Sequence, residues 1–192
     1  MLDVTLRTIS ISLFIGRYIY WIVEQKRSEK ILPKIKRSLS WYELTSKYVY
    51  IAIQVLIVLQ LLGLPLYQLP NNSIFQLVGF VLLIIGVGID IFARKEIGNN
   101  WTSGEEYQIK ENQKLITTGI YKYIRHPIYT GFALSFIGAE MVAGSWLFVA
   151  FFAYFISSYV QGKREEKILL GHFGEKYKDY MKKTKMLIPW IW

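Results

Sequence analysis

The sequence contains no cysteine and only two histidines in its 192 residues. Without cysteine there can be no disulfide and no thiolate chemistry. Two histidines among scattered carboxylates give no cluster of metal ligands, so we expect no metal site. Charged residues are also few, at 19%, whereas hydrophobic residues make up 53%. This composition argues against an ordinary soluble domain, and the length predicts one compact unit.

The charge that is present is mostly positive, giving a net charge of +9. Lysines and arginines gather beside apolar runs, which favours the surface of an anionic lipid bilayer over nucleic acid as the partner. The first residues, Met1-Leu2-Asp3, include no basic region. We therefore expect no cleavable signal peptide here.

The apolar residues form long runs, which predict an all-α, polytopic membrane protein with about five transmembrane helices. The last two runs are each about 22 Å long at ~1.5 Å per residue, shorter than the ~30 Å hydrocarbon core. Only 143–145 separates them, so they predict a helical hairpin. Glycines in the third run, at positions 79, 86 and 88, would let another helix approach closely. The five runs cover 4–23, 48–64, 74–93, 128–142 and 146–160.

The links between these runs differ sharply in charge. Lysine and arginine are concentrated in 24–47, 94–127 and 161–192, whereas 65–73 and 143–145 contain neither. By the positive-inside rule, this pattern predicts an N-terminus outside the cell and the three basic links on the cytoplasmic face. The spacing of apolar residues within 161–192 predicts a separate amphipathic helix after the last span.

Four charged residues lie inside the predicted spans, namely Arg7 and Glu140 near span ends, together with Arg17 and Asp90. Arg17 should face other helices or the interface, because a charge exposed to lipid tails is costly. Asp90 is a candidate functional carboxylate for the same reason. The favoured interpretation is nevertheless a local pair with Arg94, four residues later on the same helix.

The polar stretch 118–131 contains Arg125-His126-Pro127 between two apolar regions. Pro127 suits the first turn of a helix, and the free N–H groups at such a start can hold a carboxylate. The alternative is a membrane-flanking loop in which aromatic residues anchor the headgroup boundary. Those residues are Tyr121, Tyr123 and Tyr129.

The chain carries two motif blocks, one on each side of the predicted hairpin. The first block consists of Lys114-Leu115-Ile116-Thr117-Thr118-Gly119-Ile120-Tyr121 and then Arg125-His126-Pro127-Ile128-Tyr129. The second block is Glu165-Glu166-x-x-Leu169-x-x-x-Phe173-Gly174-x-x-Tyr177-x-x-Tyr180, with Pro189 after it. With Gly98-Asn99-Asn100-Trp101, this pair of blocks resembles the isoprenylcysteine carboxyl methyltransferase family of integral membrane enzymes, and more distantly the phospholipid methyltransferases. The resemblance covers roughly 94–192.

The resemblance implies S-adenosylmethionine as the cofactor and a division into three N-terminal helices (1–93) and a catalytic region (94–192). In that region the cytoplasmic C-terminal segment would complete the cofactor pocket. It also implies catalytic roles for Arg125 and Glu165 and substrate contacts from Gln161 and Arg164. The implied cofactor-binding residues are Gln113, Lys114, Leu115, Ile116, Tyr121, His126, Pro127, Ile128, Tyr129 and Glu165.

The resemblance further implies a lipid-like acceptor that reaches the site from the bilayer, with the α-carboxylate of a prenylated cysteine favoured. Gln161 stands where these enzymes place an arginine that meets the substrate. A phospholipid amine is therefore an alternative acceptor. Two other classes stay open, namely an NADPH-dependent reductase of the sterol reductase type and a non-catalytic membrane scaffold. The oligomeric state is not predicted.

Overall fold

The computed structural model describes residues 2–31, 41–70, 72–101, 109 and 112–189. Every named element within these ranges is a helix, as the sequence predicts. Three short 3-10 turns, η1 (Gly98–Asn100), η2 (Gly119–Lys122) and η3 (Trp146–Val149), lie between the longer elements. The α-helices are α1 (Leu2–Ile31), α2 (Trp41–Leu61), α3 (Ser73–Ile97), α4 (Pro127–Ala143), α5 (Ala150–Phe173) and α6 (Glu175–Lys183).

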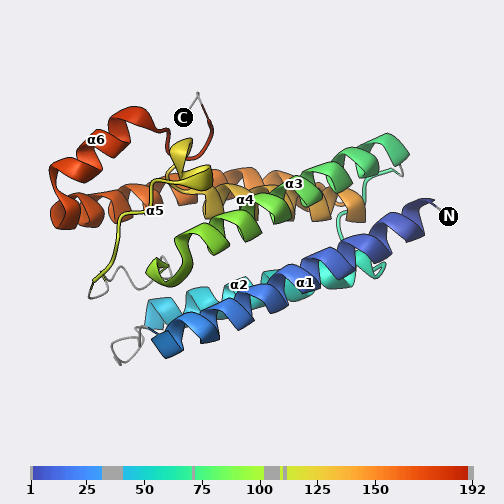
Figure 1. Cartoon of the computed structure of the whole chain (residues 1–192). Coiled ribbons are helices and arrows are strands. Elements are labelled where there is room, and N and C mark those ends of the chain that lie inside the picture. Colours follow the sequence, from blue (N-terminus) through green and yellow to red (C-terminus); the bar gives the residue numbers. More distant parts are fainter. Residues whose placement is uncertain (1, 32–40, 71, 102–108, 110–111, 190–192) are drawn as a thin grey trace.

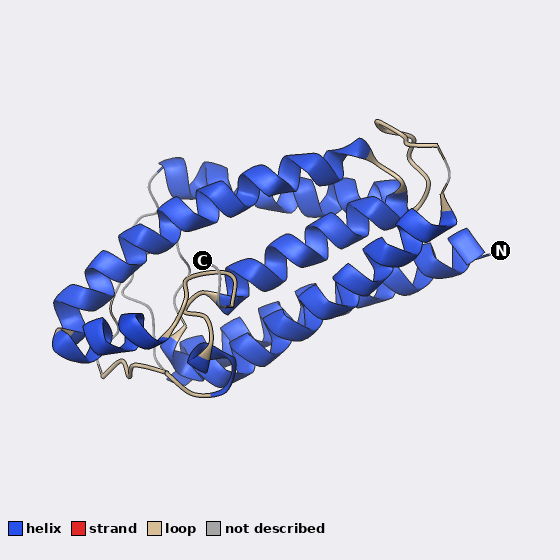
Figure 2. Ribbon diagram, turned by 90° about the horizontal axis from the view of Figure 1, so that it is seen from above, coloured by secondary structure: helices blue, strands red, loops and turns tan. Residues whose placement is uncertain are grey.

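The five long helices run up and down through an elongated bundle (Figure 1). The ends of α1, α3 and α5 and the start of α4 lie at one end of the bundle, and α6 lies there too. The opposite end holds the N-terminus and the starts of α3 and α5 (Figures 1 and 2). The helix ends next to the basic links are thus gathered at one end of the molecule.

The α4–α5 hairpin forms where the sequence predicts it. Gly144 ends α4 in the left-handed conformation, at φ 71°, and the hydroxyl of Ser145 accepts a hydrogen bond from the N–H of Leu147 to start the next turn. The predicted C-terminal amphipathic segment is helical but is divided between two helices, because α5 continues without a break to Phe173 and α6 covers Glu175–Lys183. The break falls at Gly174, whose φ of 56° suits glycine.

Two helices, α1 and α3, are long and apolar enough to cross a membrane, over Asp3–Ser28 and Ser73–Asn100. Tyr48–Leu61 and Pro127–Ala143 are shorter apolar helices. Large apolar side chains such as Val4 on α1, Ile74 on α3 and Ile156 on α5 remain mostly exposed. This exposure fits contact with lipid, because a soluble surface rarely carries so much apolar area.

Glycine allows α3 and α4 to pack backbone against backbone. A Cβ at Gly86 would lie 2.8 Å from the carbonyl oxygen of Gly131, and one at Gly79 would lie 2.9 Å from that of Gly138. Close packing was therefore predicted correctly for these two residues of α3. For Gly88 the prediction is wrong, since nothing lies within 4 Å of a Cβ placed there.

The buried charges pair differently from the prediction. Asp90 lies 3.2 Å from Arg17 Nη1 and accepts a hydrogen bond of 2.7 Å from Trp21 Nε1, both on α1. Arg94 instead donates to the carbonyl oxygens of Gly98 and Glu24. The Asp90–Arg94 pair is thus replaced by a contact between helices, because the buried carboxylate faces α1. Arg17 faces the bundle interior as predicted, with 1% of its surface exposed.

We expect Gly86→Ala to destabilise the protein by about 1–3 kcal/mol, because the added methyl group has no space between α3 and α4. Gly88→Ala, on the same helix, should be neutral or slightly stabilising, since alanine favours helix and meets no neighbour. Unfolding midpoints in detergent measure both variants. Equal midpoints would contradict the packing.

Candidate active site at the start of α4

The segment before α4 is held by the C-terminal segment of the chain. The backbone N–H groups of Arg125 and His126 donate to the carbonyl oxygens of Lys185 and Met186, at 2.9 and 3.0 Å, and the N–H of Lys185 donates to Tyr123 at 3.1 Å. These bonds form an isolated parallel bridge between Ile124 and Lys185. Two stretches sixty residues apart in sequence thus behave as one backbone unit.

The side chain of Arg125 connects this unit to α5. Its Nε lies 2.5 Å from Glu166 Oε1, and both side chains are almost completely buried, with 7% and 3% exposed. Its Nη1 donates to the carbonyl oxygen of Thr184 at 2.5 Å. The guanidinium therefore joins the start of α4, the middle of α5 and the C-terminal segment.

His126 precedes Pro127, the first residue of α4, and its ring lies against α5. Its Nδ1 is 3.4 Å from Glu165 Oε2, and its Nε2 is 3.6 Å from Glu166 Oε1, which is an ion-pair separation but too long for a hydrogen bond. Gly162 makes this approach possible. A Cβ at that position would lie 3.2 Å from His126 Nε2 and 2.5 Å from the methyl group of Met186.

Tyr129 completes the contact between α4 and α5. Its hydroxyl donates to Glu165 and its ring stacks on that of His126, with centroids 5.5 Å apart and planes 13° from parallel. Gln161, one turn before Glu165 on α5, lies near the Tyr129 hydroxyl. Glu165 keeps 22% of its side chain exposed, so a ligand can reach it, whereas Glu166 is closed off.

The charges of this group depend on one another. Burial alone would lower the pKa of His126, but the carboxylates of Glu165 and Glu166 outweigh it and raise this pKa above the ordinary value. Burial would raise the pKa of Glu166, but His126 and Arg125 outweigh it and lower this pKa to about 2. The site therefore favours a charged Glu166 next to a histidine that readily takes a proton.

An apolar cluster lies next to these polar groups. Tyr121 and Ile128 are buried in it with Trp21 and Ala93, and Ile116 packs against the cluster from the link before η2. The hydroxyl of Tyr180 donates to the carbonyl oxygen of Tyr121 at 2.7 Å, so α6 also fixes this wall. A planar apolar group could pack here while its polar part reaches Glu165.

The other residues predicted for the site make fewer contacts with His126 and Glu165. The N–H of Lys114 donates to the Asn100 side chain at 2.7 Å, which brings the Gly98–Trp101 element next to the link that also holds Gln113 and Leu115. Arg164 is exposed on α5, and within the described residues no hydrogen bond or ion pair joins it to His126 or Glu165. Sequence reasoning missed Glu166 and Gly162 as site residues. The adjacent Glu165-Glu166 pair was a signal for the first, and only the fold reveals the second.

The comparisons with known proteins agree with this arrangement. The family model described as phospholipid methyltransferase matches residues 74–176, which is more than half of the chain. The bundle with its polar site at one end is thus that of an integral membrane methyltransferase family. The chain belongs to the phospholipid methyltransferase family. The resemblance inferred from the two sequence blocks is confirmed.

Several relatives carry names from this group. The chain is 29% identical over 129 residues to protein-S-isoprenylcysteine O-methyltransferase of Dictyostelium discoideum, covering 65% of this chain and 54% of that protein. It is 43% identical over 72 residues to methanethiol S-methyltransferase 1 of Bradyrhizobium diazoefficiens, covering 37% of this chain and 25% of that protein. The chain spans about half the length, or less, of these two curated relatives.

A solved structure shares the fold. The eukaryotic intramembrane Ras methyltransferase ICMT superposes with a TM-score of 0.58 at 20% identity, covering 99% of this chain and 72% of that one. The similarity extends over α1–α3, which the sequence motifs do not cover. The predicted all-α membrane fold is therefore shown, although its orientation in the membrane is not.

We expect Glu166→Gln to destabilise the protein by about 3 kcal/mol at pH 7, because Arg125 would be left buried without its partner. Because the pKa of Glu166 is lowered from 4.5 to about 2, the stability that its charge contributes is present above pH 4.5 and is lost as the pH falls towards 2. The difference between variant and wild type should shrink over that window. Unfolding midpoints from pH 7 to 3 measure it.

Glu175→Gln is the matched control, since the Glu175 side chain is 78% exposed and pairs only with Lys178. We expect its midpoint to match that of the wild type at every pH. If both variants behaved alike, the Arg125–Glu166 pair would not hold the site together.

Proposed function

We propose that this chain is a membrane methyltransferase that uses S-adenosylmethionine to methylate a lipid-like acceptor. Its membership of a methyltransferase family supports this function over the reductase and scaffold alternatives. The observation that carries the proposal is the contact of His126 and Tyr129, at the start of α4, with Glu165 on α5. These residues come from the two sequence blocks to which the family resemblance assigns cofactor binding.

The residues present fit this cofactor. Its carboxylate suits His126 and the N–H groups of the first turn of α4, where the His126 side chain makes no capping hydrogen bond. Buried His126 Nε2 has no hydrogen-bond partner among the described residues, although Glu166 Oε1 lies 3.6 Å from it. Glu165 suits the ammonium or a ribose hydroxyl. The cluster around Tyr121 and Ile128 suits the adenine ring.

When bound, the cofactor supplies an activated methyl group on a positively charged sulfur. The chain's own contribution is to orient and to exclude water. Arg125 acts as a positioning residue in this proposal, since its Nε and Nη1 donate to Glu166 and Thr184. Tyr129 holds the Glu165 carboxylate, and the buried wall around Tyr121 keeps water from the reacting groups. Proximity and desolvation of this kind can lower the barrier by several kcal/mol.

The proposed arrangement in the membrane has five spans, α1–α5, with the N-terminus outside and the site facing the cytoplasm. The charge of the links and the gathering of their helix ends at one end of the bundle support it. The acceptor would reach the site sideways from the bilayer, past the α4–α5 hairpin. The division into 1–93 and 94–192 stays a prediction.

For the acceptor, the names of the relatives favour the α-carboxylate of a prenylated cysteine. A carboxylate is already nucleophilic, so it needs no general base. One observation favours a second candidate, an acceptor without a carboxylate, such as a phospholipid amine that first loses its proton, or a thiol. Gln161 places an amide near Tyr129 where the prenylcysteine enzymes place a cation, and one relative is named for methylating methanethiol.

Glu165→Gln should weaken binding of S-adenosylhomocysteine about ten- to a hundredfold, because a charge-assisted hydrogen bond to the ligand is lost. Glu175→Gln should leave the affinity unchanged. Isothermal titration of the detergent-purified chain measures both. Binding of NADPH in place of S-adenosylhomocysteine would refute the methyltransferase proposal in favour of a reductase.

The acceptor classes differ in their response to Gln161→Arg. If the wild type methylates a farnesylcysteine analogue, the added cation should lower the KM for that carboxylate about tenfold. If it methylates phosphatidylethanolamine or a thiol, the same change should lower that activity. Transfer of a radiolabelled methyl group to each acceptor measures the outcome. Activity on the carboxylate that is unaffected by the change would exclude a contact between residue 161 and the acceptor.

A further inference from the structure

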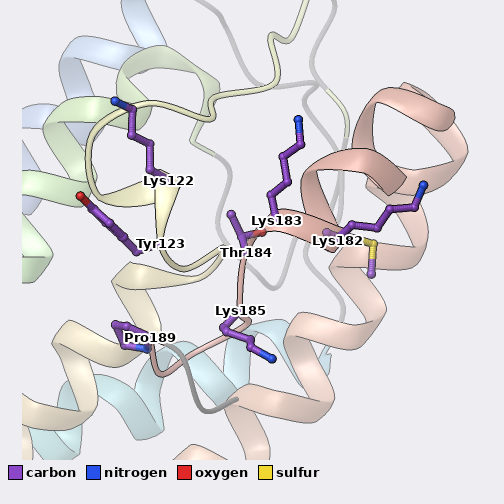
Figure 3. A pocket seen from close by; sticks show the side chains of 8 residues that line it. Lys122, Tyr123, Lys182, Lys183, Thr184, Lys185 and Pro189 are labelled. Carbon is purple, nitrogen blue, oxygen red and sulfur yellow. The ribbon is translucent and has the colours of Figure 1, made fainter.

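A cavity lies between the end of η2 and the segment that follows α6. Its volume is about 200 Å³. Lys122 and Tyr123 come from the end of η2 and the residue after it, and the other residues come from the end of α6 and the segment that follows (Figure 3). We call it the lysine pocket, and it is lined by Lys122, Tyr123, Met181, Lys182, Lys183, Thr184, Lys185 and Pro189.

The lysine pocket has an excess of positive charge. Lys182 pairs with Asp179, 2.8 Å away. The lysine side chains that line the pocket extend from its wall in different directions (Figure 3). Among the residues that the structure describes, no carboxylate pairs with Lys122, Lys183 or Lys185. All three are exposed. Favourable interaction with the C-terminal end of α6 accounts for Lys183, but Lys122 and Lys185 lie outside that helix.

The size and chemistry of the pocket limit its ligand. Ammonium groups are donors only, so they select an anion. The volume is below the roughly 300–1,000 Å³ of sites that hold drug-sized ligands, which indicates a compact group rather than a whole nucleotide. S-Adenosylmethionine carries no phosphate, and none of its proposed contacts lines this pocket. The pocket is thus separate in both place and charge from the site around Glu165.

The position of the pocket favours the bilayer surface. Lys122 and Tyr123 lie just before Pro127, where the apolar helix α4 begins. In the proposed orientation this is the level of the cytoplasmic headgroups, where anionic lipids attract lysine side chains. Tyr123, with 55% of its surface exposed, is an aromatic residue of the kind found at that boundary.

We infer that the lysine pocket binds a phosphate group, carried by an anionic lipid headgroup or free in solution. A phosphate between Lys122 and the lysines at 183 and 185 would bridge the two stretches that the Lys185–Tyr123 and Arg125–Lys185 backbone bonds already join. Occupancy therefore stabilises the backbone unit that holds Arg125 and His126. The binding itself does not depend on methyl transfer.

The test uses the full chain in detergent, without cofactor. Native mass spectrometry and the unfolding midpoint follow two separate titrations, one with phosphatidylglycerol and one with pyrophosphate, and phosphatidylcholine serves as the neutral lipid. The pocket variant combines Lys122→Gln, Lys183→Gln and Lys185→Gln. A matched control removes the same charge from exposed lysines outside the pocket, through Lys95→Gln, Lys167→Gln and Lys176→Gln.

We expect the wild type to bind phosphatidylglycerol in preference to phosphatidylcholine, with a raised unfolding midpoint. The pocket variant should bind about tenfold more weakly than the control. A variant with arginine at the same three positions should bind like the wild type, which guards against misfolding as the cause. Pyrophosphate binding with the same dependence would show that the site takes free phosphate, whereas binding of the lipid alone would place the ligand in the bilayer.

Equal loss in the pocket and control variants would overturn the inference, because it would mean that binding follows net charge alone. Unchanged binding in the pocket variant would overturn it too. Because no cofactor is present, either result leaves the proposed methyltransferase activity untouched, and the titration with S-adenosylhomocysteine tests that activity separately.

Discussion

The buried ion pair between Arg125 and Glu166 is the contact on which the candidate site depends. Removing two charges from solvent is costly, so a pair like this is weak support for stability by itself. The ion pair acts by holding the connected helices in position. It fixes the start of α4 against α5, and through the Thr184 carbonyl oxygen it also fixes the C-terminal segment. His126 and Glu165, next to these two residues in the chain, are thereby brought together.

The rest of the bundle gives this contact a rigid frame. Glycines let α3 and α4 approach until their backbones touch, so the start of α4 cannot move independently of α3. The Arg17–Asp90 pair and the Trp21 hydrogen bond tie α1 to the same helix pair. Trp21 then forms part of the wall next to Tyr121. The N-terminal helices, which match no sequence motif, therefore shape the proposed cofactor pocket.

The C-terminal segment contributes to both proposed binding sites. Met186 and backbone carbonyl oxygens contact His126 and Arg125, whereas Lys183 and Lys185 line the lysine pocket. In the proposed function, the site lies at the boundary between the bilayer and water. A segment with apolar Met186 next to lysines fits that proposed position.

The all-helical membrane fold, the hairpin and the family could be predicted from the sequence, because long apolar runs and two spaced motifs are local patterns. The same motifs identified His126 and Glu165 as members of one candidate site. The partner of each buried charge became known from the folded arrangement of the helices alone. Asp90 joins Arg17 rather than Arg94, Arg125 joins Glu166, and Gly162 makes room for the His126 ring. Such pairings depend on which faces of distant helices meet, and the spacing of residues along one helix does not contain that information.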